Sequence, residues 1–189
     1  MASPVKIAHI VLRTRRYEKM IKWYQFVFEG TIQHQNPKIC FMTFDDEHHR
    51  FAFINLGEDE YDVATPNEVP ASGIDHVAFS FDDLDSLMST YKRLKQNDIK
   101  PYWPIHHGMT ISLYYKDPDD NRLELQVDKF ETMQEGSDFF HSEQFAKNPI
   151  GINIDVEELL HRYESGENHQ SLFALPEAPP AKIPPEHDI

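Results

Sequence analysis

The chain has 189 residues, which suits one well-filled domain with an appendage better than two large domains. Its formal net charge of -14 argues against a nucleic-acid or anionic-membrane partner, because phosphate binding needs clustered Lys and Arg. No apolar run approaches the roughly 20 residues of a membrane span, and the start MASPVKIAHI lacks a signal-peptide pattern. The single cysteine, Cys40, excludes an intramolecular disulfide. We therefore expect a cytoplasmic protein that binds a small molecule.

An internal repeat organises the first two thirds of the chain. The segment HIVLRTRRYEKMIKWYQFV begins at His9, and it matches HVAFSFDDLDSLMSTYKRL, which begins at His76, in both its first residue and its apolar pattern. In each copy a strand-like stretch leads into apolar residues spaced by three and four, which is typical of a helix with one face on a sheet. Each copy is therefore predicted to begin with a strand followed by a helix.

Three further strands are predicted after each helix. They are TIQHQ, ICFMTF and RFAFINL in the first copy, and KPYWPI, MTISLYY and RLELQV in the second. The predicted fold class is α+β, with two βαβββ modules, residues 5–56 and 73–128. Residues 57–72 are expected to link the modules within a domain spanning 5–128. The remainder, 129–189, is predicted to be an irregular and helical extension whose last dozen residues are poorly ordered.

Strand alternation collects polar side chains on one face of the second module. His76, Tyr114 and Glu124 share a parity opposite to the apolar residues of their strands, and the repeat adds His9. Each residue taken alone is more often structural or solvated than a ligand, but two imidazoles and a carboxylate on one concave face form a metal-site pattern. The other histidines among polar residues are expected to be surface imidazoles: His34, His48, His49, His141, His161, His169 and His187.

These motifs resemble a known family. The openings AHIVL and DHVAF of the two modules are similar to the vicinal oxygen chelate superfamily, which includes glyoxalase I, bleomycin- and fosfomycin-resistance proteins and the type I extradiol dioxygenases. The resemblance covers residues 5–128 and implies that the two modules form one curved mixed sheet around a metal cleft. The stretch SLYYKDPDDNRLELQ is similar to the closing motif of the biphenyl-2,3-diol and catechol dioxygenases, with Tyr114 and Glu124 in register. This resemblance implies that His9, His76 and Glu124 are iron ligands and that Tyr114 is a catalytic phenol beside them.

The implied activity is that of a non-haem Fe(II) dioxygenase acting on a vicinal diol or enediol, aromatic in kind, with O2 as cosubstrate. Mn(II) or another divalent metal is the alternative, and two His with one carboxylate leave positions open for both reactants. The family also implies a catalytic His upstream of the tyrosine. His106 and His107 lie one and two residues after the aligned position, so either could serve, or both could be loop residues. Phe53, Tyr102 and Trp103 are candidates for an apolar substrate-binding wall, with core packing as the alternative.

Rival functions are separated by one absent residue. Glyoxalase I would need a fourth ligand, a Glu in the last strand of the first module, and RFAFINLG at residues 50–57 contains no carboxylate. The fosfomycin-modifying branch also uses two His and a Glu, but no basic residues are grouped to hold a phosphonate. A metal-dependent isomerase, lyase or epimerase and a metal-free ligand-sequestering module are the alternatives. A homodimer is expected, because such modules commonly pair.

Overall fold

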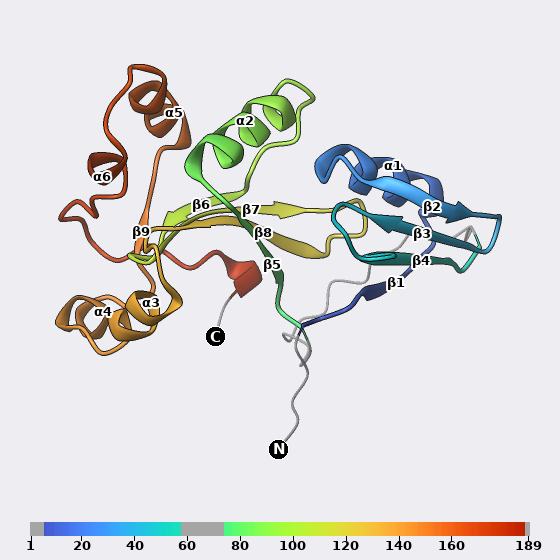
Figure 1. The fold of residues 1–189 in the computed structure, drawn as a ribbon, viewed down its shortest axis with the longest axis horizontal. Coiled ribbons are helices and arrows are strands. Elements are labelled where there is room, and N and C mark those ends of the chain that lie inside the picture. The colour runs from blue at the N-terminus through green and yellow to red at the C-terminus, as the bar shows by residue number, and fades with distance from the viewer. Residues whose placement is uncertain (1–5, 58–73, 188–189) are drawn as a thin grey trace. The chain divides into compact units, whose positions relative to one another are not determined.

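The computed structural model describes residues 6–57 and 74–187, and the chain divides into two compact units (Figure 1). Unit 1 comprises Met1–Val69 with Asp117–Asn121, and unit 2 comprises Pro70–Lys116 with Arg122–Ile189. Each unit contains its own sheet. The expected linker, residues 57–72, lies almost entirely outside the described residues.

Unit 1 is a four-stranded mixed sheet with one helix. Its strand order is β1 (Ile10–Thr14), β4 (Phe51–Asn55), β3 (Ile39–Thr43) and β2 (Thr31–Gln35), with β1 parallel to β4 and the other pairs antiparallel. The helix α1 (Tyr17–Val27) buries its apolar stripe, as the spacing of three and four predicts. Within this core the Tyr24 ring packs against Phe51 and Phe53, with ring centroids 4.7 and 5.0 Å apart.

The acidic turn Asp117–Asn121 is grouped with unit 1. The Tyr24 hydroxyl donates to Oδ2 of Asp117 at 2.9 Å, and the Arg16 guanidinium donates to the carbonyl of Pro118 at 2.5 Å. Burial raises the pKa of Asp117, because it removes the ionised carboxylate from water. The hydrogen bond from the Tyr24 hydroxyl acts in the opposite direction and stabilises the ionised carboxylate.

Unit 2 is a five-stranded sheet built from the second module and one strand of the extension. Its order is β5 (Val77–Phe81), β8 (Arg122–Asp128), β7 (Thr110–Lys116), β6 (Trp103–His106) and β9 (Ile152–Asn153), with β5 parallel to β8. The helix α2 (Leu84–Lys95) begins after Asp83, whose side chain accepts from the backbone N–H of Ser86. The apolar residues that the spacing of three and four places on one face of this helix are all buried: Leu84, Leu87, Met88, Tyr91 and Leu94.

The α+β class and the repeated βαβββ order are confirmed, whereas the single continuous sheet is not. Among the described residues, every strand of the first module pairs within that module, and the second module pairs only with itself and β9. The first strand of each module pairs in parallel with the last strand of the same module and forms one edge of that module's sheet.

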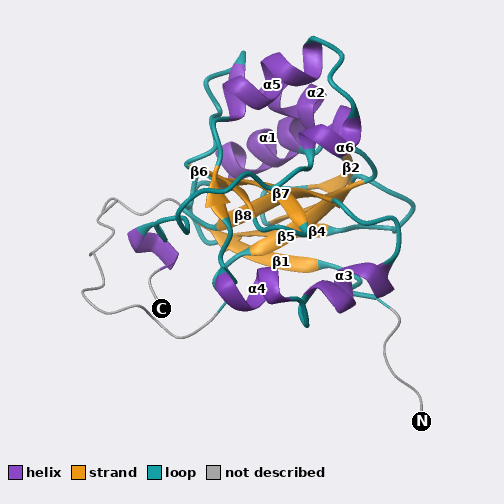
Figure 2. Cartoon of the chain, turned by 90° about the vertical axis from the view of Figure 1, so that its left-hand side faces the viewer, coloured by secondary structure: helices purple, strands orange, loops and turns teal. Residues whose placement is uncertain are grey.

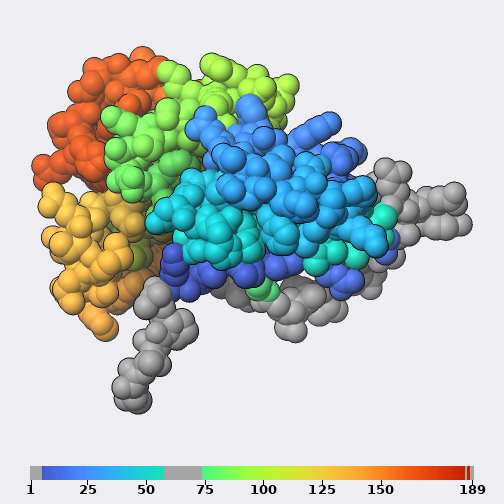
Figure 3. All heavy atoms as spheres, turned by 45° about the vertical axis from the view of Figure 1, so that its right-hand side comes forward, coloured from blue at the N-terminus to red at the C-terminus, as the bar shows by residue number. Residues whose placement is uncertain are grey.

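The extension supplies the remaining elements: α3 (Met133–Phe139), α4 (Glu143–Lys147), β9, α5 (Val156–Glu164), α6 (His169–Leu172) and a 3₁₀ helix at Pro185–His187. Helices α2 and α5 lie on one side of the unit 2 sheet and α3 and α4 on the other (Figure 2). In the space-filling view the α3–α4 and α5–α6 segments form two lobes (Figure 3). Asp155 caps α5 by accepting from the N–H groups of Glu157 and Glu158.

In the part of the chain that the structure describes, no helix is long and apolar enough to cross a membrane.

The Pro-rich terminus has a defined course as far as His187. The sequence predicts poor order for the last dozen residues, yet the backbone N–H of Ala181 donates to the carbonyl of Gly151 at 2.8 Å. The 3₁₀ helix then brings His187 to a buried position with 8% exposure. The expectation that His187 is a surface imidazole is therefore wrong.

Candidate metal site

His76 and Glu124 form the centre of the site in unit 2. His76 directly precedes β5, and its Nε2 lies 3.1 Å from Oε2 of Glu124. Its other ring nitrogen, Nδ1, lies 2.7 Å from Oδ1 of Asp75. The His76 side chain is 31% exposed, whereas that of Glu124 is 6% exposed. A half-buried imidazole therefore lies at the opening of a site whose carboxylate is deep.

Strand pairing explains why Glu124 is buried here. In β8 it pairs with Ala78 of β5 on one side and with Tyr114 of β7 on the other, so it lies in the middle of the sheet. Burial alone would raise the pKa of Glu124, but hydrogen bonds from His76 and Ser112 outweigh it and lower the pKa. The carboxylate is ionised at neutral pH and available as a ligand.

The contact between His76 and Glu124 requires a positive charge between the two side chains. A carboxylate oxygen accepts only, and Nδ1 of His76 already donates to Asp75, so Nε2 facing an ionised Glu124 must carry either a proton or a metal. The hydrogen bond to Glu124 raises the pKa of His76. This shift favours the form of His76 in which Nε2 carries a proton. A metal would take the place of that proton, since ligand atoms bind metals in their deprotonated form.

The spacing of the two ligand atoms fits a shared metal. Two ligand atoms that each lie about 2.1 Å from one divalent ion, at a right angle, are about 3.0 Å apart. The observed separation between His76 Nε2 and Glu124 Oε2 is 3.1 Å. The donor set of imidazole and carboxylate suits iron, manganese or zinc.

Tyr114 and His107 complete the polar side of the site. The Tyr114 hydroxyl is hydrogen-bonded to Glu124 and lies 3.4 Å from Nε2 of His107. Nδ1 of His107 donates to the carbonyl of Ile150 at 2.6 Å, which leaves Nε2 as an acceptor, 3.9 Å from Oε1 of Glu124. Burial lowers the pKa of His107 and raises that of Tyr114, so both side chains are neutral at physiological pH.

The structure separates His106 from this group. His106 is 2% exposed, its Nδ1 accepts from the N–H of Gly108 at 2.9 Å, and its Nε2 lies 3.2 Å from the carbonyl of Phe173. Burial lowers the pKa of His106 to about 4. His106 is therefore a neutral core residue under the extension, and His107 is the histidine beside Glu124.

The three candidates for an apolar wall have different locations. Trp103 and Tyr102 lie next to Tyr114, with ring centroids 4.9 and 6.3 Å from its ring. The indole N–H of Trp103 donates to the side chain of Asn153 in β9, which fixes the ring. Phe53 instead lies fully buried in the core of unit 1 against Tyr24, so the core-packing alternative holds for Phe53.

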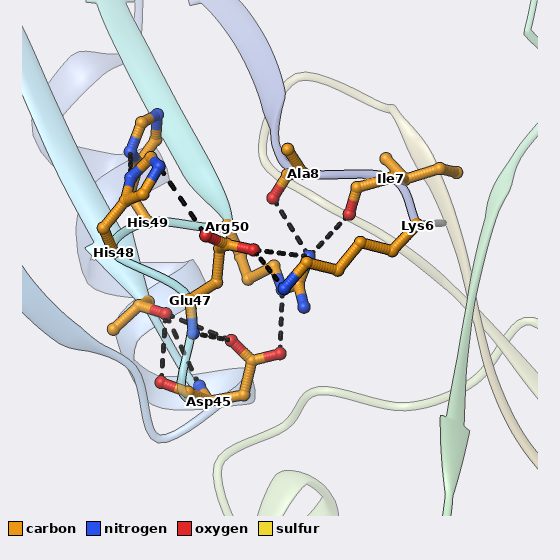
Figure 4. Close-up of polar contacts among 9 residues, drawn as sticks. Lys6, Ile7, Ala8, Asp45, Glu47, His48, His49 and Arg50 are labelled. Carbon is orange, nitrogen blue, oxygen red and sulfur yellow. Dashed lines mark hydrogen bonds and ion pairs between the residues drawn. The ribbon is translucent and has the colours of Figure 1, made fainter. Parts of the chain in front are cut away.

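His9 belongs to unit 1 and takes the same place in its module as His76, directly before the first strand. It is exposed, and its ring stacks on that of His49 with centroids 4.5 Å apart. The backbone before His9 is held by Arg50, whose guanidinium donates to the carbonyls of Ile7 at 2.5 Å and Ala8 at 3.0 Å (Figure 4). This network presents an exposed imidazole on an anchored segment.

Sequence reasoning misses a second group of side chains around His76. Asp75, His76 and His187 offer ligand atoms within 4.8 Å of one another, and Arg122 binds Oδ2 of Asp75 at 3.0 Å. The adjacent residues Asp75 and His76 could have indicated this group. Strand alternation does not reveal it, because alternation places neighbouring residues on opposite faces. No local signal points to His187, which is 112 residues away from Asp75.

Residues 6–125 match the family model of the Glyoxalase/Bleomycin resistance protein/Dioxygenase superfamily. The chain belongs to this superfamily.

Two similar curated proteins come from Rhodococcus globerulus. Biphenyl-2,3-diol 1,2-dioxygenase 2 is 39% identical over 155 residues, covering 82% of this chain and 80% of the relative. Biphenyl-2,3-diol 1,2-dioxygenase 3 is 38% identical over 166 residues, covering 88% and 86%. Among solved structures, the fosfomycin resistance protein FosX from Mesorhizobium loti aligns with a TM-score of 0.51 at 20% identity, over 71% of this chain and 99% of that chain. This structural likeness supports the fold alone.

Proposed function

We propose that the chain is a non-haem Fe(II) dioxygenase that cleaves the ring of a vicinal aromatic diol next to its two hydroxyl groups. The observation that carries the proposal is the His76–Glu124 pair, whose ligand atoms lie 3.1 Å apart. The identity of 38–39% to two biphenyl-2,3-diol 1,2-dioxygenases over more than four fifths of the chain supports the reaction class.

His9 is proposed as the third ligand. Its support is the repeat: His9 precedes β1 as His76 precedes β5, and both strands run parallel to the last strand of their module. Two imidazoles and one carboxylate leave room at a metal for two substrate oxygens and O2. Fe(II) fits this donor set, and Mn(II) is the alternative metal.

The first module offers no fourth ligand at the position equivalent to Glu124. In the second module, Ala78 pairs with Glu124; in the first, the equivalent residue, Val11, pairs with Ala52. Ala52 is 2% exposed and has no donor atom. A ligand set of three favours oxygen chemistry over an isomerase that uses four protein ligands.

The side chains near Glu124 provide the acid–base chemistry. When bound, the metal would acidify the diol hydroxyls and provide the redox step with O2. His107, neutral and with Nε2 unprotonated, is suited to take a proton from a diol hydroxyl and return it later. Tyr114 remains a phenol because burial raises its pKa, and its single hydroxyl hydrogen is donated to Glu124 or, in exchange, to a substrate oxygen atom. Tyr102, which is half-buried, is the candidate for contact with the aromatic ring of the substrate, whereas Trp103 is 8% exposed and packs in the core with Ile105 and Tyr114.

Oxygen consumption tests this proposal. Protein loaded anaerobically with Fe(II) and given 2,3-dihydroxybiphenyl or catechol is expected to consume O2 in proportion to the diol. The matched control is protein loaded with Zn(II), which cannot supply the redox step and should consume none. Turnover of a substrate with Zn(II) and without O2 would instead indicate a metal-dependent isomerase or lyase, and ligand binding without metal would indicate a sequestering module.

The homodimer remains a prediction from the sequence. Light scattering on the full chain would measure the oligomeric state.

A further inference from the structure

His187, near the end of the chain, has both ring nitrogens engaged in unit 2. Its Nδ1 lies 2.7 Å from Oδ1 of Asp75, and its Nε2 lies 2.6 Å from the hydroxyl of Tyr102. The residue is 8% exposed. Two hydrogen bonds at a buried imidazole fix both its position and its orientation.

Aromatic rings of the candidate site surround His187. The ring stacks on Tyr102 with an interplanar angle of 12° and a centroid distance of 5.9 Å. Trp103 and Tyr114 each lie 5.1 Å from it, and His76 lies 5.7 Å from it, measured between centroids. The C-terminal segment therefore reaches the residues that surround the metal-binding pair.

A single oxygen atom connects His187 to His76. Oδ1 of Asp75 lies 2.7 Å from Nδ1 of both histidines, while Arg122 binds Oδ2 at 3.0 Å. An ionised carboxylate only accepts hydrogen bonds, so both Nδ1 atoms carry hydrogen. With Nδ1 of His76 held by Asp75, its Nε2 faces Glu124. With Nδ1 of His187 held by Asp75, its Nε2 is left to accept a hydrogen bond from the Tyr102 hydroxyl.

We propose that His187 is a positioning residue of the metal site, an inference that rests on the proposed function. Its donated hydrogen bond, together with Arg122, fixes the Asp75 carboxylate, and Asp75 in turn fixes the ring orientation and tautomer of His76. Histidines that bind metals characteristically donate their other N–H to a carboxylate or carbonyl, and loss of such a partner typically lowers metal affinity by about 10–100-fold. The chain thus uses its C-terminal segment to support a ligand in the middle of its sequence.

Two substitutions separate the contacts of His187. The amide nitrogen of Asn can replace Nδ1 of a histidine, whereas that of Gln reaches the place of Nε2. His187→Asn is therefore expected to keep the contact with Asp75 and the affinity for Co(II), measured by absorption titration. His187→Gln, His187→Ala and Asp75→Asn are expected to lose affinity about tenfold. His161→Ala, which removes an exposed histidine from the same extension, is the control and should bind Co(II) like the wild type.

The inference is overturned if all His187 variants bind Co(II) equally well, if His187→Gln retains affinity while His187→Asn loses it, or if all three lose affinity together with equal falls in melting temperature. If the wild type binds no metal, the proposed function is refuted, but the role of His187 can still be tested by a second measurement. Long-range proton–nitrogen NMR spectra of the metal-free protein should find the hydrogen of neutral His187 on Nδ1. A hydrogen on Nε2 would refute the role of His187 independently.

Discussion

Glu124→Gln is expected to abolish iron binding and oxygen consumption together. The substitution preserves size but removes the ionised oxygen that faces His76, and an amide is a poor ligand for Fe(II) beside imidazoles. Loss of a direct ligand should exceed the about 10–100-fold cost of losing an outer partner. Iron per chain after anaerobic desalting, measured by elemental analysis, checks this expectation.

Asp128→Asn is the matched control, since it removes one carboxylate from the end of the same strand, β8. In unit 1, His9→Ala should also lose iron, whereas substitution of His49, on which His9 stacks, should not. Full iron content in Glu124→Gln would contradict the assignment of this residue as a ligand. Full iron content in His9→Ala would leave His76 and Glu124 as ligands and remove His9.

His107→Ala is expected to lower kcat by about 10²–10⁴-fold, the usual contribution of a general acid or base, while iron remains bound. The reason is that Nε2 of His107 lies 3.4 Å from the Tyr114 hydroxyl and has no proton of its own. Steady-state oxygen uptake at saturating diol measures the effect.

His106→Ala, a substitution of the adjacent residue, is expected to change stability and not kcat. His106 is a buried core residue with two backbone partners, so its loss should lower the melting temperature and leave kcat of the folded enzyme nearly unchanged. A large fall in kcat for His106→Ala, with an unchanged kcat for His107→Ala, would reverse the two roles.

The convergence of His76, Tyr114 and Glu124 could be predicted from the sequence because strand alternation is a local rule. Once β5, β7 and β8 are recognised, their pairing places Glu124 beside Tyr114, and the repeat adds an equivalent place for His9. The choice between His106 and His107 could not be made in the same way. A shift of one residue moves a side chain to the opposite face, and β6 ends at His106.

Phe53 and His187 could not be placed for different reasons. In β4, Phe51, Ala52 and Phe53 are all buried, so alternation does not distinguish its two faces. His187 reaches Asp75 through a tertiary contact across 112 residues, in a Pro-rich segment whose composition suggests disorder. The division into two sheets was also missed, because a repeat predicts the module but not whether neighbouring modules share a backbone ladder.

Incorporation of oxygen-18 tests the central claim most directly. Protein loaded with Fe(II) and given 2,3-dihydroxybiphenyl under oxygen-18 gas should yield a ring-opened product that carries the label, as mass spectrometry of the product reveals. A product without label, formed equally well without O2, would contradict the assignment as a dioxygenase.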